Sequence, residues 1–202
     1  MRTPSPKATS IAVAAATPVA ILAAGALVWQ SSYAAFSGTT RNSGNDWATG
    51  AVALTDDDAG SARFQVASMV PGQTETKCIT VTANASVPGV VKGYAVNPVP
   101  SAAGLENYVK IGIVSGDGGG FGSCDGFVGD TTVIPSGTSL KTLAGVDSYA
   151  AGAGGWNVTA GTQSRTYRIT WTFDTTGLTQ TQVDQLQGAR TGIDLQWELR
   201  SN

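Results

Sequence analysis

The stretch Tyr167-Arg168-Ile169-Thr170-Trp171-Thr172-Phe173 (residues 167–173) decides the fold class of this chain. Its odd positions are apolar and its even positions carry arginine or threonine. Because successive side chains of a strand point to opposite faces, this period of two predicts a strand with one buried face and one wet face. Antiparallel sheets are built from such strands. We therefore expect an antiparallel β protein with Trp171 in its core.

The end of the chain repeats this pattern. An apolar set alternates there with a polar set, namely Ile193, Leu195, Trp197 and Leu199 with Asp194, Gln196, Glu198 and Arg200. We expect the apolar set, Trp197 included, to face the core and the polar set to face solvent.

Shorter runs rich in valine, isoleucine and aromatic residues predict the remaining strands. They span residues 51–54, 62–69, 76–83, 90–96, 108–114 and 131–134, with long glycine-rich loops at 115–122 and 144–155. Thr179 and Gln182 have capping-box spacing, and Gly188 follows as a helix terminator, which predicts one short helix. The pattern therefore predicts a jelly-roll-like antiparallel β-sandwich of about eight strands with one short helix.

Composition and charge narrow the possible functions. Hydrophobic residues reach 42% and the net charge is only −2, which argues against a disordered chain. The 12 lysines and arginines occur singly, so a nucleic-acid partner lacks the cation cluster that phosphates require. The chain has no histidine, which excludes a Ser-His-Asp relay and every histidine-ligated metal site. We expect neither a cofactor nor a catalytic residue set.

The N-terminus has the pattern of an export signal. Arg2 and Lys7 precede an uncharged stretch over residues 11–28, and small residues follow. We expect residues 1–35 to be a signal peptide that signal peptidase cleaves next to Ala34 or Ala35. A transmembrane anchor is the alternative, although the alanine-rich stretch would insert only marginally.

A polar segment follows the expected cleavage point. Residues 37–46 show no apolar face, so we expect residues 36–47 to form a flexible arm that precedes one sandwich domain over residues 48–202. The arm has too few apolar groups to fold alone, and only Phe36 and Trp47 are large. We expect it to be dispensable for folding, and either a disordered tail or a strand that joins a neighbouring sheet.

The two cysteines, Cys78 and Cys124, are an even pair in a chain that we expect to be exported. A disulfide is therefore their leading interpretation, ahead of reactive thiols or a metal site. In the chain-entropy model, closing this loop stabilises the fold by about 4 kcal/mol.

Two further motifs have weak functional interpretations. Asp56, Asp57 and Asp58 could ligate calcium, but they lack the alternating acids and terminal glutamate of an EF-hand, so we favour a solvated turn. The glycine-rich run over residues 116–122 lacks the Lys-Ser/Thr of a phosphate loop, so we expect a loop tied down by Cys124.

Several motifs in order resemble the TasA/camelysin family, in its actinobacterial branch. The junction over residues 33–36 resembles the end of a SipW-dependent-type signal, and the step over residues 47–54 resembles that family's entry into its first strand. The turn over residues 70–73 before the Cys78 strand, and the Cys124-x-x-Phe127 context, are similar as well. The match covers most of the chain, but the middle and the C-terminal third match only as alternating strands.

The resemblance implies a jelly-roll protein that a Gram-positive bacterium exports to its surface or to the extracellular biofilm matrix. In the TasA branch, subunits form fibres when the arm of one adds as a strand to the next, so the partners would be copies of this chain or homologous matrix subunits. The camelysin branch carries a peptidase label, but this chain shows no zinc ligand set. The alternatives are a cell-surface peptidase and a surface module that binds a glycan or a host protein. We expect no membrane association after signal cleavage.

Overall fold

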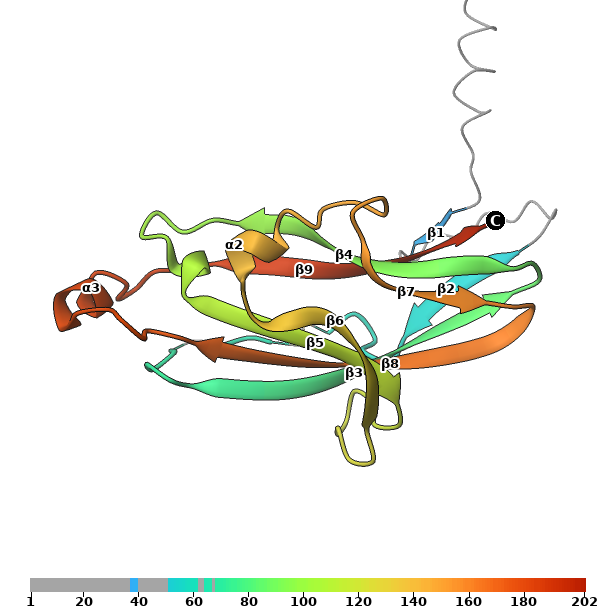
Figure 1. The fold of residues 1–202 in the computed structure, drawn as a ribbon, viewed down its shortest axis with the longest axis horizontal. Coiled ribbons are helices and arrows are strands. Elements are labelled where there is room, and N and C mark those ends of the chain that lie inside the picture. The colour runs from blue at the N-terminus through green and yellow to red at the C-terminus, as the bar shows by residue number, and fades with distance from the viewer. Residues whose placement is uncertain (1–36, 40–50, 62–63, 67) are drawn as a thin grey trace, which may run out of the picture. The chain divides into compact units, whose positions relative to one another are not determined.

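The computed structural model describes residues 37–39, 51–61, 64–66 and 68–202. Within these residues the chain forms two antiparallel sheets that lie face to face (Figure 1). A four-stranded sheet has the order β1-β9-β4-β7, and a five-stranded sheet has the order β2-β3-β8-β5-β6. The expected antiparallel sandwich is confirmed.

The elements have the following bounds. The four-stranded sheet contains β1 (Ser37–Thr39), β4 (Gly89–Val99), β7 (Ala153–Val158) and β9 (Gly192–Ser201). The five-stranded sheet contains β2 (Val52–Asp56), β3 (Thr74–Ala85), β5 (Val109–Asp117), β6 (Val128–Ser139) and β8 (Gly161–Phe173). The short helical segments are η1 (Leu105–Asn107), α2 (Leu140–Leu143) and α3 (Gln180–Asp184).

The strand pairs are nested as in a jelly roll. The outermost pair is β1 with β9, followed inward by β3 with β8, β4 with β7, and the hairpin of β5 with β6. Successive strands from β3 to β5 and from β6 to β9 alternate between the two sheets. This nesting brings strands from opposite ends of the chain together, and it places β9 beside β1.

The inner faces of both sheets form the main core. Tyr167, Ile169 and Leu199 are almost fully buried there, as the alternating patterns predict. Trp171 and Trp197 are 4% and 6% exposed, so their expected core positions are confirmed. The Tyr167 and Trp197 rings, one from each sheet, lie 5.2 Å apart.

A second apolar cluster includes Leu105, Trp171 and Leu186. Thr179 is the N-cap residue of α3. Its side chain accepts a hydrogen bond from the backbone N–H of Gln182, while the Gln182 side chain accepts one from the N–H of Thr179. This capping box confirms the short helix expected from the sequence.

The strand expected over residues 62–69 is wrong, because residues 64–66 and 68–69 are not in a strand. Phe64, Val66 and Met69 pack instead against the second apolar cluster. Their alternation therefore reflects side-chain burial rather than backbone pairing.

Part of the loop expected over residues 144–155 is also strand. β7 begins at Ala153 and pairs with β4 through a bulged ladder. Its Ala-Gly-Gly start has little intrinsic strand preference. Glycine is required at position 154 because φ there is +61° and a Cβ would lie 2.6 Å from Val133. Likewise β5 extends to Asp117, into the loop expected over residues 115–122.

Candidate functional site at the β9 edge

The edge of β9 that carries β1 is the first candidate site. Ser37, Gly38 and Thr39 lie opposite Arg200, Leu199 and Glu198, so β1 pairs over only three residues. The first three residues after Phe36 in the expected arm therefore lie in a strand. The site residues Ala34, Ala35, Phe36 and Trp47, and the signal over residues 1–35, lie outside the described residues.

Glu198 is the charged residue that the alternating pattern misplaces. It belongs to the polar set of β9, yet it is only 4% exposed. Its carboxylate accepts hydrogen bonds from the Tyr94 hydroxyl at 2.7 Å and from Arg200 Nε at 2.8 Å. A buried carboxylate needs such partners, because desolvation without them costs several kcal/mol. The network therefore holds the end of β9 in one arrangement.

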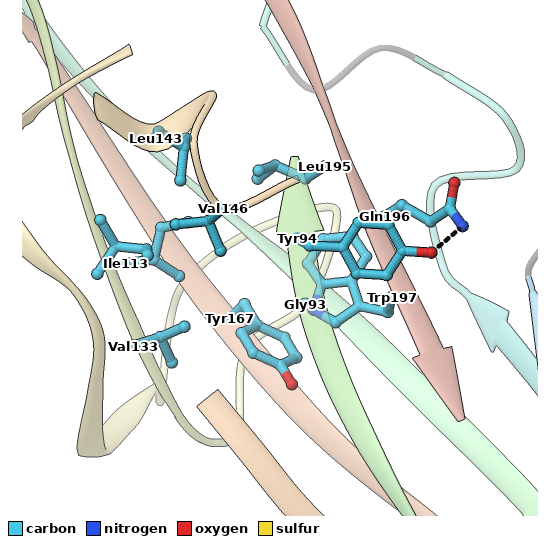
Figure 2. A pocket seen from close by; sticks show the side chains of 11 residues that line it. Gly93, Tyr94, Ile113, Val133, Leu143, Val146, Tyr167, Leu195, Gln196 and Trp197 are labelled. Atoms are coloured by element: carbon cyan, nitrogen blue, oxygen red, sulfur yellow. Dashed lines mark hydrogen bonds between the residues drawn. The ribbon is translucent and has the colours of Figure 1, made fainter. Parts of the chain in front are cut away.

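Further contacts extend this network across the face of the four-stranded sheet. Gln196 Nε2 donates to the Tyr94 hydroxyl at 2.7 Å, the bond dashed in Figure 2. The Arg200 guanidinium lies 4.2 Å from the centre of the Tyr149 ring, and Lys92 Nζ lies 5.1 Å from it. Tyr149 in turn donates its hydroxyl proton to the backbone oxygen of Val90 at 2.9 Å. These contacts fix a cationic, aromatic surface beside the β1 edge.

The tyrosines here are unsuited to acid–base chemistry at neutral pH. Burial, followed by the hydrogen bond to Glu198, raises the pKa of Tyr94 to about 12. Burial alone raises the pKa of Tyr167 to about 12, although hydrogen bonds from tryptophans oppose it. Both groups stay protonated at neutral pH and serve as hydrogen-bonding groups.

One small cavity lies between the two sheets in the part of the chain that the structure describes. Figure 2 shows side chains from both sheets and from the α2–β7 loop, among them Ile113, Val146, Tyr167 and Trp197, around a cavity of about 20 Å³. That space is enough for a water molecule, whereas small-molecule sites measure about 300–1,000 Å³.

The disulfide between Cys78 and Cys124 is present, as the sequence indicates. It ties the glycine-rich loop over residues 118–127 to the outward face of β3. Phe127 of this loop lies under the Arg168 guanidinium, 4.8 Å from ring centre to Cζ. The loop is thus held by a covalent bond and by a cation–π contact.

The acidic turn over residues 56–58 supports this loop. Asp57 accepts hydrogen bonds from the backbone N–H groups of Thr80 at 2.8 Å and Phe121 at 2.7 Å, which links β3 to the loop. Asp58 accepts one from the N–H of Gly60. Among the residues that the structure describes, no group of three histidine, cysteine, aspartate or glutamate side chains is arranged to hold a metal ion.

Asp56 gives this turn a pH dependence. Burial, with further contributions from Asp58, raises the pKa of Asp56 from 3.8 to about 6. The folded state therefore binds this proton more tightly than the unfolded state, so stability rises as the pH falls through 6 towards 3.8. We expect the melting temperature to rise by about 2–4 °C from pH 7.5 to pH 5, since solvent screening limits the effect to about 1 kcal/mol.

No histidine contributes to the pH dependence of stability between pH 5 and pH 7.5, because the chain has none. Thermal unfolding of Asp56→Asn should show a flattened pH dependence over this range, and Asp58→Asn should reduce the slope as well. Asp147→Asn, at an exposed loop position, is the matched control and should keep the slope of the parent chain. An unchanged slope in Asp56→Asn would contradict the assignment to Asp56.

No protein-family model matches the chain, and no curated protein matches it significantly. Among the described residues, none of the helices is long and apolar enough to cross a membrane.

Proposed function

We propose that this protein is an exported structural subunit of the cell surface or extracellular matrix, joined to further copies by exchange of its N-terminal strand. The pairing of β1 with β9 is the observation that carries the proposal. A strand of three residues at the N-terminal end of the described chain completes the four-stranded sheet.

The pairing of β1 is suited to exchange. A strand held by three residue pairs contributes little to the stability of its own chain, so its release costs little. The same backbone hydrogen bonds form whether β1 comes from the same chain or from a neighbour, which is the basis of domain swapping. Residues 40–51 separate β1 from β2, and a segment of that length can bridge two subunits.

The accepting edge is rigid. Glu198, opposite Thr39, is fixed by Tyr94 and Arg200, and Leu199, opposite Gly38, is fully buried in the core. A preorganised edge lowers the ordering cost of strand addition. The disulfide suits an oxidising, extracellular compartment, and the lack of histidine removes the commonest hydrolytic mechanisms.

Truncation of the arm tests the proposal. We expect a chain beginning at Ala48 to unfold within a few degrees of the mature chain that begins at Phe36, because it loses only the β1 pairing. It should form no filaments and should not enter those of the intact protein, because the exchanging strand is gone. Electron microscopy and thermal unfolding are the measurements, and casein digestion with and without chelator tests the peptidase alternative on the same material.

A full-length control separates strand pairing from arm length. Gly38→Pro/Thr39→Pro keeps the length of the arm but removes two backbone donors from β1, and it should abolish filaments like the truncation. A Gly-Ser replacement of residues 40–46 keeps β1 and should retain assembly. Assembly of the truncated chain at an undiminished rate would rule out strand exchange and leave the arm as a linker.

A further inference from the structure

The outward face of the five-stranded sheet carries paired hydroxyl groups. On the facing positions of β3 and β8, four side-chain pairs hydrogen bond across the strands, namely Thr74–Thr172 at 3.0 Å, Thr76–Thr170 at 2.8 Å, Thr80–Thr166 at 3.0 Å and Thr82–Ser164 at 2.9 Å. Each such pair uses one hydroxyl proton between its two oxygens. In the Thr74–Thr172 pair both protons are used, because Thr74 donates its own to the backbone oxygen of Trp171 at 2.7 Å. In the Thr76–Thr170 pair a second proton and lone pairs remain for a ligand, whereas Thr166 is buried.

The disulfide loop divides this face. Cys78 lies opposite Arg168 between the second and third hydroxyl pairs, and Cys78 is fully buried because the loop over residues 118–127 covers it. One half of the face contains the pairs of Thr74 and Thr76, and the other contains those of Thr80 and Thr82. The two halves have matching chemistry but different neighbours.

The half that contains Thr170 and Thr172 borders a groove of about 190 Å³. Its far side is built by the bulge of β6, where Ser136 and Gly137 fall between the residues that pair with Ile111 and Ile113. Gly112 lies beneath, and a Cβ there would approach the Cα of Ser136 to 3.0 Å. Glycine at this position therefore allows the bulge to lie close over β5.

The lining has a balanced charge and many hydrogen-bonding groups. Lys110 and Asp174 stand at the groove with the hydroxyls of Ser136, Thr170 and Thr172. Hydrogen bonds from Thr176, and to a smaller extent the charge of Lys110, lower the pKa of Asp174, so one cation and one anion offset each other at neutral pH. A polyanion gains nothing from such a groove, whereas an uncharged ligand with several hydroxyl groups finds both donors and acceptors.

We propose that this groove binds a sugar residue of a neutral glycan through the hydroxyls of Ser136, Thr170 and Thr172 and the charged side chains of Lys110 and Asp174. The groove, at about 190 Å³, is smaller than a typical small-molecule site of about 300–1,000 Å³, so it holds one sugar residue rather than a longer segment. Its lining residues include no aromatic ring, so one site binds weakly, with a dissociation constant of about 1 mM or more. This use of weak sites rests on the proposed function. A fibre repeats the site in every subunit, and many weak sites acting together hold a matrix polysaccharide with high avidity.

The test uses monomeric mature chain, beginning at Phe36 and isolated by size exclusion, titrated with cellohexaose and with maltohexaose. We expect saturable changes in the amide NMR signals of Gly112, Gly137 and Thr170 with at least one of the two neutral oligosaccharides. Oligogalacturonate of the same length should bind more weakly. Because the chain is unassembled in this experiment, its outcome is independent of whether strand exchange occurs.

Two variants with matched chemistry locate the site. Thr170→Val removes a hydroxyl from the pair beside the groove, and it should weaken binding about two- to tenfold. Thr82→Val removes a hydroxyl from the equivalent pair in the other half of the face, and it should leave binding unchanged. Thermal unfolding of both variants controls for folding. Absence of signal changes at tens of millimolar of either neutral oligosaccharide, stronger binding of oligogalacturonate, or equal weakening by both variants would overturn the proposal.

Discussion

Replacement of both Cys78 and Cys124 by alanine should lower the free energy of unfolding by about 4 kcal/mol. The disulfide closes a loop between residues 46 positions apart, and its loss returns that loop-closure entropy to the unfolded chain. For a domain of this size the melting temperature should fall by about 8–16 °C. Denaturant and thermal unfolding of the oxidised parent and of the double variant measure the effect.

Asp57→Asn separates the two ways in which the loop is held. That variant weakens the hydrogen bonds from Thr80 and Phe121 but keeps the covalent closure, so it should cost only about 1–2 kcal/mol. The reduced parent chain should resemble the double cysteine variant. A loss below about 1 kcal/mol in the double variant would contradict the entropic account and would indicate that the other contacts hold the loop unaided.

The strands that the sequence predicts best are those whose two faces meet different surroundings. Residues 167–173 and 193–199 alternate because one face of each packs in the core and the other does not, and both lie within strands of the structure. The same logic failed at residues 62–69, where the apolar side chains pack against the second apolar cluster although residues 64–66 and 68–69 are not in a strand. Periodicity reports which side chains are buried, and it carries no information on whether the backbone has a partner strand.

The sequence pattern does not predict β7, because this strand has a partner but shows no apolar period. Its backbone pairs with β4, but Gly154 and Gly155 have no side chains that could display a period. The strand forms because the tertiary structure supplies a partner for its backbone, which overrides a weak local preference. The capping box of α3 needed no such help, since Thr179 and Gln182 satisfy one another within a single turn.

The environment of Glu198 was beyond prediction from its own strand. Its position in the alternation places it with Gln196 and Arg200, outside the core. Its burial depends on Tyr94, which is 104 residues away in the chain and reaches it only through the pairing of β4 with β9. The groove beside Gly112 likewise depends on contacts between strands, because it forms only where the bulge of β6 pairs with β5.

Trp197→Ala should destabilise the protein by about 3–5 kcal/mol, because truncation of a buried aromatic removes its transfer free energy and leaves a cavity. Trp197 is 6% exposed, contacts the Tyr167 ring of the opposite sheet, and lines the existing interior cavity, which the substitution would enlarge. The melting temperature should fall by about 6–20 °C. Val128→Ala, at a side chain that is 70% exposed, is the control and should change it little. An unchanged melting temperature in Trp197→Ala would contradict the inner position of this side chain.

A double-mutant cycle with Gly93 tests the packing of Trp197. The two residues are cross-strand neighbours, and a Cβ on Gly93 would lie 3.2 Å from Trp197 Nε1 and 3.3 Å from its Cδ1. Gly93→Ala alone should therefore cost about 1–3 kcal/mol by crowding a rigid indole. In the Trp197→Ala background the added methyl group enters space that the indole has left, so the same substitution should cost little or restore part of the loss. Denaturant unfolding of the four proteins gives the interaction free energy, and strict additivity would show that Gly93 is not there to accommodate the indole.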